Sequence, residues 1–278
     1  FPDRPWPGLA GGVPTAFIRP QIPLSGVDVM NKFGCLPLAV VLASIVAPAS
    51  ADVFQFTGTA SSGEGKTLYE EQHRVEGTCE SGTFRPLEHS VTYVHSVNGN
   101  AEVFGDKTLD YHQSAIRPTV NFQQPDFQES LKITYPNADS VSVVLREPGG
   151  DTKRSSVDSS ENLVVDAGFD NLVRQHWEEV TGGKSVKFRF LAPSRGTDYA
   201  FILEPTQSQA VKADHVMQIR PDSIMLKFLV DPIILGYNNQ GALTAYSGLT
   251  NVRENADQNY TATILYNVGT YPECGLTP

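Results

Sequence analysis

LEHSVTYVHSV, residues 87–97, alternates larger side chains with polar ones and decides the fold class. Its odd positions carry Leu, His, Val, Tyr, His and Val, the period-two pattern of a strand with one covered face. The Asn-Gly-Asn at residues 98–100 then turns the chain, and residues 101–109 return as the second arm of a hairpin. The stretch therefore predicts antiparallel neighbours.

The same alternation continues along the rest of the chain. Residues 128–135 and 140–146 flank a turn at residues 136–139, and another hairpin turns at residues 238–241. Further strands are predicted at residues 185–191, 199–204, 211–219 and 260–266. Crossover helices do not separate these strands regularly, so a parallel α/β sheet is disfavoured. The sequence predicts a mainly β protein with one large curved antiparallel sheet or open barrel.

One amphipathic helix is expected at about residues 169–181. Its apolar face consists of Leu172, Val173, Trp177 and Val180. Asp166 or Asp170 is placed to cap its start, and the glycines at residues 182–183 are placed to end it. We expect this helix to pack on the concave face of the sheet. Residues 222–229 are ambiguous between a second short helix and a buried strand.

Residues 30–51 have the form of a cleavable secretion signal. After Lys32 comes an uncharged apolar segment too short to cross a bilayer comfortably, and Ala-Ser-Ala at residues 49–51 follows it. Cleavage is therefore predicted after Ala51, with a retained membrane anchor as the alternative. Residues 1–29 are rich in proline and contain no methionine, so they read as upstream translation or a disordered extension.

Cleavage would leave residues 52–278 as a single β-rich domain, and the expected compartment is the periplasm. The whole chain has a formal net charge of −10 and no run of Lys and Arg. Phosphate backbones and anionic lipid surfaces would repel such a chain, so binding of nucleic acid or a membrane surface is disfavoured. We expect no stable membrane span after cleavage.

Two cysteines, Cys79 and Cys274, remain after the signal. In an oxidising compartment they form either one disulfide, which would contribute roughly 2–4 kcal/mol, or two separate thiols. Sequence alone leaves both readings open. A C-x-x-C motif is absent, so redox catalysis and a structural zinc site are unsupported, and we expect no metal or cofactor.

No motif with a known mechanism fixes a reaction in this sequence. A Gly-x-Ser-x-Gly elbow, a His-Glu-x-x-His helix, a phosphate-binding glycine loop and a dinucleotide fingerprint are all absent. His89 and His95 share a strand face, but about 20 Å separates them, too far to hold one metal ion. They are expected to be surface or otherwise satisfied side chains.

The candidate ligand-binding residues are Arg195, Trp177 and His176. An arginine just after an apolar strand can form a bidentate pair with a ligand carboxylate, or with Asp166 or Asp170 at the helix start. Both alternatives for Arg195 stay open. His176 and Trp177 lie on the predicted helix at the edge and in the middle of its apolar stripe.

Three stretches carry a family resemblance. Residues 165–177 read VDAGFDNLVRQHW, residues 188–195 read FRFLAPSR, and YSGLTN at residues 246–251 precedes Gln-Asn-Tyr at residues 258–260. They resemble a family of uncharacterised exported, periplasmic proteins of Gram-negative bacteria with VDAGFDxxVRxxW and FxxPSR motifs. The resemblance implies a β-rich envelope protein and brings no known activity or catalytic residues.

These observations favour non-enzymatic binding of an apolar or lipid-like ligand, or of an envelope partner protein of unknown identity, in a cleft between sheet and helix. One alternative is a hydrolase whose site combines separated residues such as Ser194, His176 and Asp170. The other is a structural envelope component. A fold alone does not choose among them.

Overall fold

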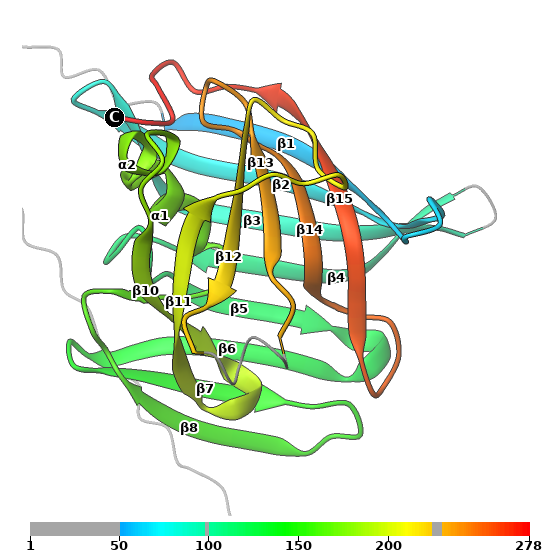
Figure 1. Ribbon diagram of the computed structural model, residues 1–278. Coiled ribbons are helices and arrows are strands. Elements are labelled where there is room, and N and C mark those ends of the chain that lie inside the picture. The colour runs from blue at the N-terminus through cyan, green and yellow to red at the C-terminus, as the bar shows by residue number, and fades with distance from the viewer. Residues whose placement is uncertain (1–50, 98–99, 224–229) are drawn as a thin grey trace, which may run out of the picture. The chain divides into compact units, whose positions relative to one another are not determined.

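The computed structural model describes residues 51–97, 100–223 and 230–278 (Figure 1). Its strands are β1 (Asp52–Ser61), β2 (Thr67–Glu80), β3 (Thr83–Val97), β4 (Asn100–Asp110), β5 (Thr119–Gln124), β6 (Glu129–Asn137), β7 (Ser140–Arg146), β8 (Thr152–Asp158), β9 (Leu163–Val164), β10 (Val186–Ala192), β11 (Thr197–Pro205), β12 (His215–Pro221), β13 (Ile233–Tyr237), β14 (Leu243–Arg253) and β15 (Asn259–Thr270). Its helical segments are η1 (Pro125–Phe127), α1 (Gly168–Gln175), α2 (Trp177–Thr181) and η2 (Pro193–Arg195).

The fifteen strands form one sheet whose order runs from β8 back to β1, continues into β15 and ends at β9. Antiparallel pairing of β1 with β15 places Thr59 opposite Leu265 and joins the two halves. Among the strands of the described residues, only β9 and β10 form a parallel pair. Figure 1 shows the half containing β10–β15 crossing in front of the half containing β2–β8. The predicted mainly β fold with one large curved antiparallel sheet is confirmed.

Turn chemistry explains the tight hairpin between β2 and β3. Ser81 and Gly82 have φ values of 53° and 84°, and Glu80 pairs with Thr83 across the two-residue turn. Positive φ at both central positions matches the right-handed twist of the flanking strands. The resulting register places His89 opposite Val75 on β2. The predicted inward alternation of β3 is confirmed, since His89, Val91 and Tyr93 are buried.

Apolar side chains fill the space inside the curled sheet. The largest cluster draws on both halves and includes Ile133 and Leu191. A second cluster packs α1 and α2 against β10–β14 through residues such as Val173 and Leu235. Burial of one such side chain contributes about 1.5–3 kcal/mol. The cleft predicted between helix and sheet is therefore occupied, in the described residues, by core side chains.

The helix expected at residues 169–181 is two segments. His176, with φ −105° and ψ 23°, separates α1 from α2 because its backbone leaves the helical range. Leu172, Val173 and Val180 are buried as predicted. Trp177, by contrast, is only partly buried, and its ring packs edge-on against Tyr237 with the centroids 5.8 Å apart.

The predicted capping of the helix start by an aspartate side chain is wrong. Ala167 is the N-cap residue and no side chain caps α1, while Asp170 lies inside the helix. Asp166 adopts a positive φ of 47° and its carboxylate pairs with Lys107 of β4. A buried ammonium group thus engages the carboxylate that the sequence pattern assigned to capping. Gly182 does follow α2 as its C-cap, as predicted.

Cys79 and Cys274 form a disulfide, with Cα atoms 5.9 Å apart. The bond joins the end of β2 to the C-terminal tail, residues 271–278. A parallel bridge between Thr83 and Gly275 lies beside it. The disulfide reading is therefore confirmed over the two-thiol alternative.

The predicted strand at residues 211–219 begins only at His215. Upstream, Ser208 Oγ accepts hydrogen bonds from the backbone N–H groups of Ala210 and Val211, which gives this backbone a local turn instead of a ladder. Residues 98–99 and 224–229, and the predicted signal up to residue 50, lie outside the described residues. Among the helices of the described part, none is long and apolar enough to cross a membrane.

Candidate functional site

A buried ion pair lies inside the curled sheet, where an unpaired charge would be costly. Lys107 Nζ donates to both carboxylate oxygens of Asp166 at 2.9 and 3.0 Å. The two side chains are 5% and 7% exposed. Asn251 of β14 also donates to Asp166, at 3.1 Å. The pair therefore connects β4, the chain before α1 and β14.

A second ion pair connects the same two halves. Arg253 of β14 donates from Nε and Nη2 to Glu129 Oε1 of β6 at 3.0 and 2.7 Å. The backbone N–H of Arg253 donates to Gln124 Oε1 at 3.0 Å. Both ion pairs thus hold β14 against β4–β6. Their role is to position these strands within the core.

Glu71, His73 and His89 form a hydrogen-bonded row across β2 and β3. Nε2 of His73 lies 2.9 Å from Glu71 Oε2, and Nδ1 of His73 lies 3.0 Å from Nε2 of His89. Because a carboxylate only accepts, Nε2 of His73 carries a proton. Burial, followed by the positive field of His73, Lys107 and Arg174, lowers the pKa of His89 well below 6.5. His89 is therefore neutral at pH 7.

Buried tyrosines complete the polar groups of the interior. Tyr266 donates its hydroxyl to Glu71 Oε2 and Tyr237 donates to Asp170 Oδ1, each at 3.0 Å. Burial raises the pKa of both hydroxyls well above 10, and the neighbouring carboxylates act in the same direction. They stay protonated donors. Glu71, His73 and Tyr266 line neither of the two surface hollows described below, and His89 contributes to the lining of one of them but is only 8% exposed, so we assign this row to the core.

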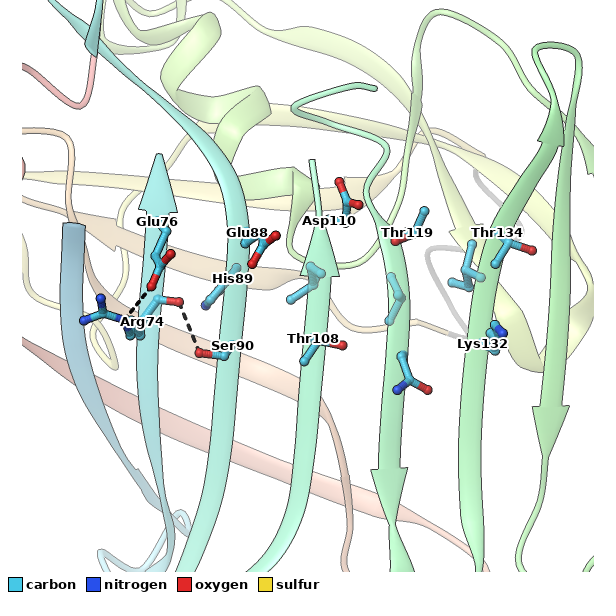
Figure 2. A pocket seen from close by; sticks show the side chains of 14 residues that line it. Arg74, Glu76, Glu88, His89, Ser90, Thr108, Asp110, Thr119, Lys132 and Thr134 are labelled. Atoms are coloured by element: carbon cyan, nitrogen blue, oxygen red, sulfur yellow. Dashed lines mark hydrogen bonds and ion pairs between the residues drawn. The ribbon is translucent and has the colours of Figure 1, made fainter. Parts of the chain in front are cut away.

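A trough of about 380 Å³ crosses the outer face of β2–β6 (Figure 2). The pairing register aligns two rows of side chains along it, Glu76, Glu88, Asp110 and Thr119 in one row and Arg74, Ser90, Thr108, Asn121 and Lys132 in the other. Figure 2 shows the ion pair between Arg74 and Glu76, at 2.9 Å, with both side chains more than two-fifths exposed. His89, Leu109, Val120, Ile133 and Thr134 also line the trough, so its walls combine polar and apolar residues.

A second hollow, also of about 380 Å³, lies between α1, the β2–β3 hairpin and the C-terminal tail. We call it the α1 hollow. It is lined by Glu80, Thr83, Phe84, Arg85 and Pro86 of the hairpin, by Ala115, by Asn171, Arg174 and Gln175 of α1, and by Leu276 and Pro278 of the tail. Its walls thus combine polar and apolar side chains.

Arg174 is the buried charge of the α1 hollow, at 7% exposed. Nε donates to the carbonyl of Gly241 at 3.0 Å, and the guanidinium lies over the Phe54 ring, 5.4 Å from its centroid. Nη2 is 2.8 Å from Asp170 Oδ2, an ion pair that lacks hydrogen-bond alignment. Nη1 has no hydrogen-bond partner among the described residues. The guanidinium, with five N–H donors, therefore keeps donors for another group.

None of the three predicted ligand-binding residues lines either hollow. Arg195 is exposed in η2. His176 Nδ1 lies 3.4 Å from Glu179 Oε1, and the Trp177 ring packs edge-on against His215 at 5.0 Å. Their role in ligand binding stays a prediction.

The alternative in which Arg195 pairs with an aspartate at the helix start is wrong. Asp166 is held by Lys107, and Asp170 by Arg174. An arginine four residues after Asp170 on the same helix reaches that carboxylate more directly than one in η2 does.

The sequence reading did not single out Arg174. A signal existed, since Asp170 and Arg174 have the i,i+4 spacing of a helical ion pair. The spacing does not reveal burial, which depends on Phe54 beneath the guanidinium and on Gly241 beside it.

Asp52, Cys79 and Cys274 bring three potential metal-ligand atoms within 4.8 Å of one another. Both sulfurs belong to the disulfide, so they offer no thiolate to a metal ion. This group is not a metal site while the bond is closed.

No protein-family model and no curated protein matches this sequence. A solved structure, described as a beta-barrel-like protein of domain of unknown function DUF1849 from Brucella abortus, is similar with a TM-score of 0.35 and 10% sequence identity. The match covers 78% of this chain and 94% of that chain.

Proposed function

We propose that this protein is an exported binding protein, not an enzyme, and that it holds a small amphipathic anion in the α1 hollow with Arg174 as the anchor. The ligand class is a carboxylate on an apolar chain. The proposed ligand is a more specific class of the apolar or lipid-like ligand that the sequence favours. Its proposed site is the α1 hollow and not the concave face of the sheet.

Arg174 is the observation that carries the proposal. Its charge is buried, and only Nε has an aligned acceptor, Gly241. Asp170 takes up one further contact through Oδ2, since its Oδ1 already accepts from Tyr237. Nη2 is buried against Asp170, so a ligand carboxylate would reach the guanidinium through Nη1, by a charge-assisted hydrogen bond.

The walls of the α1 hollow favour an amphipathic anion over a fully polar one. Phe84 and Leu276 are buried apolar lining residues, and Pro86 of the hairpin is a third. The volume of about 380 Å³ falls in the range of about 300–1,000 Å³ that is usual for small-molecule sites. An alkyl chain would cover these walls while its head group reaches Arg174.

Two observations support export. The disulfide between Cys79 and Cys274 is a bond that persists in oxidising compartments such as the periplasm. Residues 30–51 have the sequence of a secretion signal.

The hydrolase alternative has less support than binding. Asp170 is engaged by Arg174 and Tyr237, His176 is next to Glu179, and within the described residues no hydrogen bond joins either of them to Ser194. A purely structural envelope role predicts that the α1 hollow takes no ligand, and the experiment below separates it from binding.

Isothermal titration of the purified protein with sodium decanoate tests the proposal. We expect saturable one-site binding, and we expect Arg174→Gln to weaken it at least about tenfold, since a charge-assisted hydrogen bond contributes about 1.5–3 kcal/mol. Arg195→Gln is the matched control, because it removes the same charge from an exposed position outside the hollow. Decanol, with a similar chain and no charge, should bind more weakly.

Because Arg174→Gln leaves Asp170 without its cation, the same titration uses Arg174→Gln combined with Asp170→Asn, with circular dichroism to verify the fold. Equal affinity of this double variant and Arg195→Gln would contradict the proposal. So would the absence of any saturable binding to the unaltered protein.

A further inference from the structure

We propose that the Cys79–Cys274 disulfide sets the affinity of the α1 hollow, so that a dithiol reductant weakens binding of the amphipathic anion. This inference rests on the proposed function and adds a redox control to the same site. The disulfide acts as a staple between two walls of the hollow.

The staple joins two segments that line the α1 hollow. Cys79 directly precedes Glu80, which lines the hollow from the hairpin. Cys274 lies two residues before Leu276, which lines it from the tail. Opening the bond therefore frees the tail wall to move relative to the hairpin wall, and Arg174 on α1 keeps its own contacts.

Other contacts hold the tail without the disulfide. The carbonyl of Gly275 accepts from Phe84 N–H at 2.7 Å, and Gly275 N–H donates to the Gly82 carbonyl at 3.0 Å. The Leu276 side chain is 3% exposed in an apolar cluster with Phe84. Because these contacts remain, we expect the sheet to stay folded after reduction. The tail wall loses its covalent link to the hairpin and becomes looser, and the expected effect is a lower affinity for the amphipathic anion.

The bond is open to a solvent reductant, since Cys79 is an exposed residue. A thiolate of a dithiol attacks Sγ of Cys79, the S–S bond breaks, and Cys274 leaves as a thiolate that takes up a proton. The second thiol of the reductant then closes its own disulfide and releases Cys79 as a thiol. Two electrons and two protons pass from the dithiol to the protein.

Asp52 gives the reduced state a new contact. Its Oδ2 lies 2.8 Å from Sγ of Cys79 and accepts a hydrogen bond from Glu273 N–H at 3.0 Å. A closed disulfide has no S–H to donate, whereas the reduced thiol of Cys79 can donate to this carboxylate. The geometry thus accommodates both states of the bond.

Decanoate titration of the protein before and after treatment with dithiothreitol tests the inference. We expect reduction to weaken binding about tenfold, within the usual range of coupling between two sites. Cys79→Ser with Cys274→Ser should show the same weakening in oxidising buffer. Leu276→Ala should weaken binding in the oxidised protein and reduce the further effect of dithiothreitol, because it loosens the same wall.

Thermodynamic linkage between decanoate binding and reduction of the disulfide supplies a second measurement. If reduction weakens binding tenfold, saturating decanoate must lower the reduction potential of the disulfide by about 30 mV. A change in affinity of less than about twofold on reduction, with binding intact, would overturn the redox control and leave the proposed function standing. Loss of the near-ultraviolet circular dichroism on reduction would also overturn it, since the bond would then hold the fold. Failure of the oxidised protein to bind decanoate would instead remove the proposed function.

Discussion

Nε2 of His89 lies 3.0 Å from Nδ1 of His73, which places a neutral imidazole in the core beside a second histidine that is already hydrogen-bonded to Glu71. Lys107 and Arg174 add to the positive field around it. A proton added to His89 would have no carboxylate of its own. We therefore expect acid to destabilise the folded protein by favouring protonation of this buried histidine.

Stability should fall as the pH decreases below about 6.5. The unfolded chain binds a proton at His89 near that pH, whereas burial keeps the folded pKa well below it. The unfolded state then holds more protons, so unfolding becomes easier by up to about 1.4 kcal/mol per pH unit until the folded pKa is reached. Urea unfolding at about pH 7.5, 6.5 and 5.5 measures the slope.

His89→Gln should flatten this slope, and Ser90→Ala, the outward-facing neighbour on the same strand, should leave it unchanged. A slope in His89→Gln as steep as that of the unaltered protein would assign the acid sensitivity to other groups.

Lys107→Met should lower the free energy of unfolding by about 3–5 kcal/mol, because it leaves the carboxylate of Asp166 buried without its cation. Lys107→Met combined with Asp166→Asn removes both charges and should recover most of the loss. Chemical unfolding of the four proteins gives the coupling energy. A loss of less than about 0.5 kcal/mol in the single variant would mean that the pair is solvated.

Gly168→Ala should destabilise the protein by about 1–3 kcal/mol through overpacking. A Cβ at Gly168 would lie 2.2 Å from the carbonyl oxygen of Ile116, which Val165 N–H holds in place at 3.0 Å. Gly63→Ala is the control, since a Cβ there meets nothing within 4 Å. Thermal melts of the two variants should differ clearly, and equal melting temperatures would show that the start of α1 can shift.

Trp177→Ala should cost about 2–3 kcal/mol, less than the 3–5 kcal/mol typical of a fully buried aromatic, because its ring is only partly buried against Tyr237 and His215. Glu178→Ala, exposed on the same helix, should change stability by less than about 0.5 kcal/mol. Urea unfolding compares them. Equal effects of the two substitutions would place the indole outside the packed core.

The sheet could be predicted because its signal is local. Alternation along residues 87–97 has the period of the pleat, and short turns limit each strand to an antiparallel neighbour. The same alternation placed His89 on one strand face with Val91 and Tyr93, but it left open whether this histidine lies at the surface. The helix break at His176 did not, because the apolar stripe continues through it in sequence.

The candidate site could not be predicted because its contacts are long-range. Arg174 meets Gly241, and the α1 hollow needs the hairpin at Phe84 and the tail at Leu276 to come together. The disulfide was one of two open readings, since no local pattern reports the distance between Cys79 and Cys274. Asp166 was assigned to capping because its real partner, Lys107, comes from a distant strand.

The pairing of β1 with β15 also sets when folding can finish. As the chain emerges N-terminus first, β1–β8 can pair in order, but the partner of β1 on its other side is β15, the last of the fifteen described strands in chain order. Contacts between such distant segments are slow to form. Until Asn259–Thr270 has emerged, β1 presents an unpaired edge, and that edge is where an incomplete chain is most open to aggregation.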